Sequence, residues 1–115
     1  MPIRIVNAPV PLDELQRMAT EYFGEFVKAV VDVQRGVMAV GGELHADEEA
    51  LLLEQGSRQA DLWGVNLYPD RPTPERIEFD SMINLRPSQG NRSRGVDDAV
   101  VQRRIRDLVE RLIVQ

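Results

Sequence analysis

The spacing of hydrophobic residues along the chain changes between a helical and a strand-like period several times. Residues 1–10 read as an extended entry, with a short edge strand through Ile3 and Ile5. Apolar residues then recur every three or four positions, which predicts a helix that ends near Gly24. The apolar positions of this helix are Leu12, Leu15, Met18, Ala19 and Tyr22.

A β-hairpin is predicted over residues 26–45. Alternating valines mark a first strand over residues 26–33, and a second strand is expected from Val37 to about His45. The segment Gln34-Arg35-Gly36 between them is typical of a three-residue hairpin loop, in which Gly36 takes the position that needs a positive φ.

The second half of the chain predicts two more helices and two more strands. Asp47 is expected to cap a helix that ends at Gly56, and Asp97 to cap an amphipathic C-terminal helix. Residues 62–68 have strand-type composition, and prolines at 69, 72 and 74 mark a turn-rich connection. Residues 76–86 alternate in polarity, which predicts a half-buried strand over that range.

The resulting order, α-β-β-α-β-β-α, predicts a single α+β domain over residues 1–115. We expect a four-stranded, mainly antiparallel sheet with three helices covering one face. The other face would then be partly solvated or would contact a second copy.

Composition narrows the possible functions. The chain has 115 residues, of which 43% are hydrophobic and 29% charged, and these values are ordinary for a folded domain. Without cysteine it has no disulfide, thiol nucleophile or thiolate metal site. No apolar run could span a bilayer and no apolar segment follows Met1, so we expect a cytoplasmic protein. The formal net charge of −5 argues against general binding to nucleic acid.

The first candidate site lies around the only histidine, His45, which titrates near neutral pH. On a strand, Glu43 and His45 would share one face above Ala39 and Gly41, where a small ligand could sit. This pair is our candidate catalytic pair, with His45 as general acid or base oriented by Glu43 or Asp80.

Other interpretations of this segment remain open. Glu43, His45 and Asp47 could ligate a divalent metal, although their spacing matches no strong metal signature, so both metal and cofactor stay unknown. The pair could also simply hydrogen-bond a ligand. Alternatively, the acids at positions 47–49 only begin a helix, and Gly41 with Gly42 only marks a bulge.

The second candidate site is the polar loop at residues 86–95. Its donors suit phosphate or carboxylate oxygens, and they are Arg86, Ser88, Asn91, Arg92 and Arg94. A solvated turn whose arginines pair with nearby acids explains the loop equally well. We further expect a polar surface of Asn66, Asp80, Asn84 and Arg86 that adjoins Glu43 and His45.

Three segments resemble a small family of uncharacterised prokaryotic proteins that is classed as a domain of unknown function. They are VGGELHADEEALLLEQGS at residues 40–57, LWGVNLYP at residues 62–69 and INLRPSQGNRSR at residues 83–94. The resemblance covers nearly the whole chain and implies a stand-alone protein. It implies no activity, cofactor or catalytic residue.

Three functions therefore compete. The first is binding, with or without turnover, of a small anionic or phosphorylated ligand at a surface of Glu43, His45 and the arginine loop. The second is a non-catalytic homodimeric interaction module, joined through the open sheet face or through Leu112, Ile113 and Val114. The third is RNA processing or a toxin-like ribonuclease, which the acidic charge and the lack of stacking aromatics disfavour.

Overall fold

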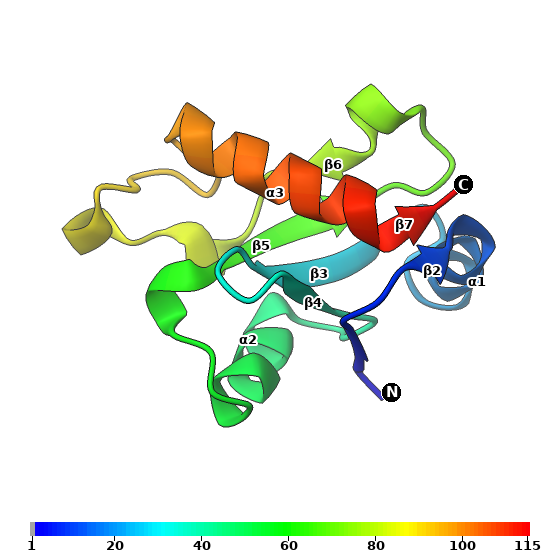
Figure 1. Cartoon of the computed structure of the whole chain (residues 1–115), viewed down its shortest axis with the longest axis horizontal. Coiled ribbons are helices and arrows are strands. Elements are labelled where there is room, and N and C mark those ends of the chain that lie inside the picture. The colour runs from blue at the N-terminus through cyan, green and yellow to red at the C-terminus, as the bar shows by residue number, and fades with distance from the viewer. Residues whose placement is uncertain (1) are drawn as a thin grey trace.

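A five-stranded antiparallel sheet in the order β1-β4-β3-β5-β6 forms the centre of the fold in the computed structural model, which describes residues 2–115 (Figure 1). Its strands are β1 (Arg4–Val6), β3 (Val27–Asp32), β4 (Val37–Val40), β5 (Leu62–Leu67) and β6 (Ile77–Glu78). The helices are α1 (Leu12–Tyr22), α2 (His45–Glu54) and α3 (Ala99–Leu112). A separate parallel pair, β2 (Val10–Pro11) and β7 (Ile113–Val114), joins the two ends of the chain.

The α+β class, the three helices and the antiparallel sheet are confirmed, but the expected count of four strands is wrong. The additional strand is β1, the edge strand expected near Ile5 but left out of that count of four; it pairs with β4 so that Arg4 lies opposite Val40 and Val6 opposite Met38. The predicted hairpin is present as β3 and β4, and Gly36 in its turn has a φ of +71°.

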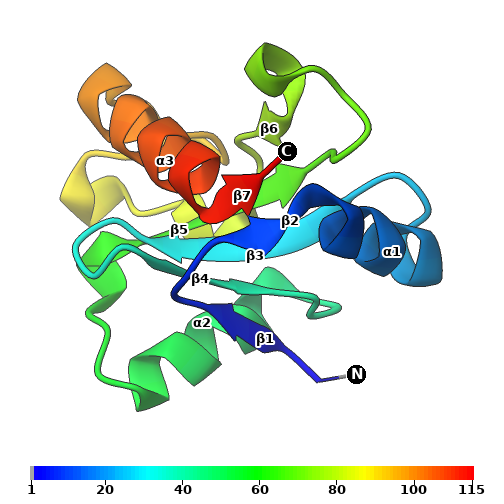
Figure 2. The same cartoon turned by 45° about the vertical axis from the view of Figure 1, so that its right-hand side comes forward.

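The helices cover both faces of the sheet, whereas we expected them on one face. Helices α3 and α2 lie on opposite sides of the strands (Figure 2). Leu15 of α1 and Ile105 of α3 belong to the same apolar cluster as Val31 on one face, and Leu52 of α2 belongs to the same cluster as Val30 on the other. The reason is that β3 carries apolar residues on both of its sides, so each side requires a cover.

The C-terminal helix and strand belong to the core. Leu112 and Ile113 are buried among the residues that α1 and α3 contribute, while Val114 is exposed. Leu112 and Ile113 are therefore not available as contacts to a second copy, contrary to our expectation. Within residues 2–115, no helix combines the length and the apolar character that crossing a membrane would require.

Two predicted strands are shorter than expected. Strand β4 ends at Val40 because Gly41, with a φ of +89°, turns the chain away from the sheet. Glu43 and His45 are consequently not on a strand, and His45 is the first residue of α2.

The predicted strand over residues 76–86 is wrong beyond Glu78. There the chain forms a short 3₁₀ helix over Met82–Asn84, which Ser81 caps by accepting a hydrogen bond from the backbone N–H of Ile83. The segment that contains Ser81 packs closely against β5: a Cβ atom on Gly64 of β5 would lie only 2.6 Å from the side chain of Ser81.

Candidate functional site

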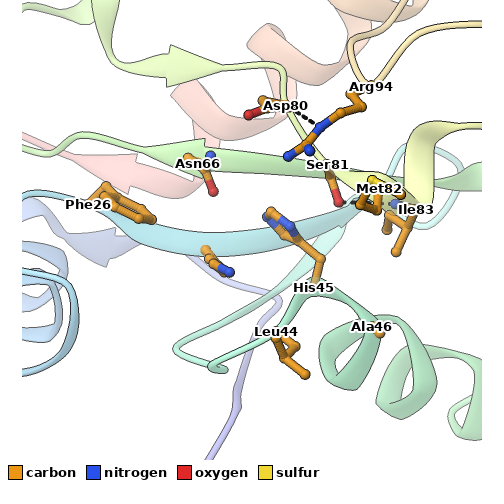
Figure 3. Close-up of a pocket in the computed structure, with 11 residues that line it drawn as sticks. Phe26, Leu44, His45, Ala46, Asn66, Asp80, Ser81, Met82, Ile83 and Arg94 are labelled. Atoms are coloured by element: carbon orange, nitrogen blue, oxygen red, sulfur yellow. Dashed lines mark hydrogen bonds and ion pairs between the residues drawn. The ribbon is translucent and has the colours of Figure 1, made fainter.

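A pocket of about 340 Å³ opens on the α2 side of the sheet, where β3, β5, the start of α2 and the segment after β6 meet (Figure 3). We call it the His45 pocket. The only histidine and the only lysine of the chain, His45 and Lys28, both line it. The lining residues are Phe26, Lys28, Leu44, His45, Ala46, Asn66, Asp80, Ser81, Met82, Ile83 and Arg94.

The sheet register brings the polar floor of the pocket together. Lys28 of β3 lies directly opposite Asn66 of β5, and the next pair on the same face is Val30 with Gly64. Helix α2 covers Val30 with its residue Leu52, which belongs to the same apolar cluster. Lys28 and Asn66 lie two residues further along their strands on the same face, and they line the pocket.

His45 is fixed to the sheet by one hydrogen bond. Its Nε2 lies 2.8 Å from the backbone oxygen of Val65. Because a carbonyl oxygen can only accept, Nε2 carries the proton and Nδ1 of the neutral ring is an acceptor. Burial lowers the pKa of His45 below 6.5, and the positive charges of Lys28 and Arg94 act in the same direction.

The amide of Asn66 has a defined orientation. Its Nδ2 donates to Oε1 of Glu78 at 2.8 Å, and an ionised carboxylate only accepts, so the amide oxygen must be on the opposite side. That oxygen, Oδ1, is buried and has no partner among residues 2–115. It points toward the side of the pocket where His45 lies (Figure 3).

The charged side chains that line the pocket are Lys28, Arg94 and Asp80, and the carboxylate of Glu78 lies next to them on the amide of Asn66. Arg94 Nε donates to Asp80 Oδ1 at 2.7 Å, so these two charges offset each other. The part of the chain that the structure describes has one other ion pair, Arg4 with Glu14, so Lys28 has no carboxylate partner there. Its ammonium lies 5.2 Å from the ring centroid of Phe23.

Apolar side chains form the remaining wall and the rim. Phe26 and Ile83 are partly buried, whereas Leu44 and Met82 are 55% and 63% exposed. This combination of an apolar wall and a few converging polar groups is typical of small-molecule sites.

The structure brings four of the predicted site residues together in this pocket, namely His45, Asn66, Asp80 and Arg94. Glu43 is not among them: it is exposed and lines a different hollow with Ile3, Gly42 and Asp47. Within residues 2–115, no three His, Cys, Asp or Glu side chains are grouped as a metal site would require. The metal interpretation of Glu43, His45 and Asp47 therefore has no geometric support.

Two predicted ligand-binding residues, Asn84 and Asn91, use their side-chain amides to form hydrogen bonds with backbone groups. Asn84 is fully buried: it accepts from Gly64 N at 2.9 Å and donates to Gly64 O and Arg94 O. Asn91 donates to the carbonyl oxygens of Asn84 and Gly95. These bonds shape the segment that presents Arg94.

The other residues of the arginine loop lie away from the pocket lining. Arg86 stacks on Trp63, with its guanidinium carbon 4.2 Å from the ring centroid, and donates to the backbone oxygens of Leu62 and Gln59. Ser88 and Arg92 are exposed. Arg94 is thus the one arginine of residues 86–95 that lines the pocket.

Two lining residues that our sequence analysis did not select are Lys28 and Phe26. A signal was present, because a lysine that interrupts alternating valines must face away from them. What the sequence did not reveal is the partner of Lys28, since register between strands distant in sequence depends on the whole sheet.

The sequence analysis read Glu48 only as one of the acids that begin a helix; it does lie in the first turn of α2, but its side chain is buried against Gly42. It is fully buried, and its Oε2 accepts from the backbone N–H of Gly42 at 3.0 Å while Oε1 has no partner in the described chain. Burial raises the pKa of Glu48 to about 9, so the side chain is protonated at neutral pH. Gly42 is required here, because a Cβ would lie 2.9 Å from Glu48 Cγ.

Comparisons with known proteins identify a family but no activity. Neither the curated proteins nor the solved structures contain a match to the chain. A family model described as "Protein of unknown function (DUF5674)" matches residues 4–112. This match confirms the prediction from the sequence that the protein is a member of a family of unknown function. The chain belongs to the DUF5674 family.

Proposed function

We propose that the protein binds a small anionic molecule in the His45 pocket. One observation carries this proposal: Lys28, whose ammonium has no carboxylate partner within residues 2–115, lines the same pocket as the neutral ring of His45 and the side chain of Asn66. An anion would supply the charge partner that Lys28 lacks within the described chain.

The charge of the pocket contrasts with that of the chain. The chain carries a formal net charge of −5, whereas two of the three charged residues that line the pocket, Lys28 and Arg94, are positive and only Asp80 is negative. The apolar wall lowers the local dielectric constant, which strengthens an ion pair formed inside the pocket. Phe26 and Ile83 would contact the carbon skeleton of the ligand.

Any turnover of the ligand would involve His45 rather than the pair of Glu43 and His45. The bond to Val65 holds the ring with Nδ1 as the acceptor nitrogen, so Nδ1 is the atom that could take a proton from a ligand. Glu43 lines a different hollow, and we assign it no part in this chemistry.

Isothermal titration calorimetry with short carboxylates and inorganic phosphate tests the proposal. Lys28→Met keeps the apolar stem of the side chain and removes its charge. Losing a charged hydrogen bond should weaken binding by about ten- to a hundredfold. Arg103→Gln is the matched control, because Arg103 is an exposed residue of α3 and its loss changes the net charge equally.

The control should bind the ligand as tightly as the wild type. The proposal is wrong if none of these anions binds to the wild-type protein, or if Lys28→Met binds them as tightly as Arg103→Gln does.

A further inference from the structure

We infer that the anion bound in the His45 pocket carries a flexible hydrocarbon chain of several carbon atoms, as in an alkyl carboxylate or an alkyl phosphate. This inference rests on the proposed function and specifies the ligand. It follows from two large apolar side chains, Leu44 and Met82, which line the pocket although each residue is more than half exposed.

Leu44 occupies a position at which a leucine gives the fold no advantage. It is the N-cap residue of α2, and its side chain makes no capping hydrogen bond. Serine, threonine, aspartate and asparagine are preferred there because they accept a hydrogen bond from a free backbone N–H, which leucine cannot do. Leu44 is also 55% exposed, so it gains little from burial within the chain. Contact with an apolar ligand accounts for a leucine at this position, since residues that break a local rule are expected at functional sites.

Met82 belongs to a different element and lines the same pocket. It is the first residue of the 3₁₀ helix over Met82–Asn84, and at 63% it is the most exposed of the large hydrophobic residues within residues 2–115. The unbranched side chain of methionine adapts its shape to the molecule that it contacts. Two separate segments of the chain thus each contribute one exposed apolar side chain to one pocket.

The pocket has further apolar lining. Phe26 and Ile83 are half-buried and line it, and Phe26 lies on the opposite side of His45 from Met82 (Figure 3). A small ion such as acetate covers only part of this surface, whereas a chain of several carbon atoms covers more of it and leaves its charged end for the basic side chains. The volume of about 340 Å³ suffices, since binding sites for small organic ligands extend from roughly 300 Å³ upward.

A series of alkyl carboxylates of increasing length tests the inference. Acetate, butanoate and hexanoate are titrated into the protein, and their affinities are measured by NMR. Each CH₂ group that leaves water strengthens binding by up to about fourfold, so we expect the wild-type protein to bind hexanoate at least about tenfold more tightly than acetate. Hexan-1-ol has the same chain without the charge and should bind more weakly than hexanoate.

Leu44→Ser and Met82→Ser remove the two exposed side chains one at a time. In each variant the ratio of the hexanoate affinity to the acetate affinity should fall by about threefold or more, while acetate binding is retained. Leu53→Ser is the matched control and should keep the wild-type ratio, because Leu53 is an exposed leucine of α2 outside the pocket lining. Serine is favourable at an N-cap, so Leu44→Ser should be at least as stable as the wild type and a loosened fold does not explain a lower ratio.

The inference is wrong if the wild-type protein binds acetate and hexanoate with equal affinity, and the proposed anion site would then survive. It is also wrong if Leu44→Ser and Met82→Ser both keep the wild-type ratio. A dimer in sedimentation velocity that these two substitutions dissociate would likewise overturn it, because a second copy would then cover the two side chains. If hexan-1-ol binds as tightly as hexanoate, or if neither carboxylate nor phosphate binds, the proposed function is wrong as well.

Discussion

The Nε2 atom of His45 lies 2.8 Å from the backbone oxygen of Val65, and this bond attaches the first residue of α2 to the centre of β5. It places the only imidazole of the chain at the wall of the pocket. It also assigns the proton to Nε2, so the imidazole meets a ligand as a neutral acceptor.

His45 should resist protonation. Burial lowers its pKa below 6.5, so as the pH falls through 6.5 the unfolded chain gains a proton before the folded chain does. The contribution of His45 to stability should therefore be fully present above pH 6.5 and be lost as the pH falls below it. Nitrogen-15 NMR of the single imidazole should show Nε2–H at pH 7 and a midpoint below 6.5, and a midpoint above 6.5 would contradict the assignment.

Glu48 should make the fold less stable as the pH rises. The folded chain keeps this proton to a pH of about 9, whereas the unfolded chain releases it near 4.5, so the free energy of unfolding falls between these values. Glu48→Gln cannot ionise and should be more stable than the wild type at pH 8, by on the order of a few kcal/mol.

Urea denaturation at a series of pH values measures this difference directly. The decline in the free energy of unfolding from pH 5 to pH 9 should be shallower in Glu48→Gln than in the wild type. Equal slopes in the two proteins would show that Glu48 ionises normally in the folded state.

The sequence predicted the elements of the fold better than its long-range contacts. The hairpin, α1 and α3 were predictable because their apolar periods and turn residues are local signals. The end of β4 was not, because the alternation runs on through Glu43 and His45, while Gly41 turns the chain after Val40.

Four of the six polar residues that line the pocket were predicted as site residues, but their spatial arrangement was not predicted. His45, Asn66, Asp80 and Arg94 were selected for their chemistry, but the same reasoning selected Asn84 and Asn91, whose amides bind backbone. Polar side chains in strand-like segments look alike in sequence whether they face a ligand or a neighbouring loop. The pairing of Lys28 with Asn66 required the register of the whole sheet.

We expect Asn84 to stabilise the fold and to have no direct contact with the ligand. Replacing it with Ala leaves the N–H and the carbonyl of Gly64 without their side-chain partner in the interior, which should cost about 2–4 kcal/mol. Thermal or urea denaturation measures this loss. Asn84→Ala should still bind the anion when it is assayed well below its melting temperature, and a variant with wild-type stability but no anion binding would make Asn84 a ligand contact instead.

The central claim is that Lys28 pairs with an anion in the His45 pocket, and the single lysine of the chain makes it directly measurable. In protein labelled with nitrogen-15 at lysine only, the Nζ resonance reports Lys28 alone. Titration with acetate should shift this resonance along a saturable curve, and Asp80→Asn, which removes the negative charge beside Arg94, should not abolish the shift. An Nζ resonance that responds to acetate and phosphate no more than to an equal concentration of sodium chloride would contradict the account.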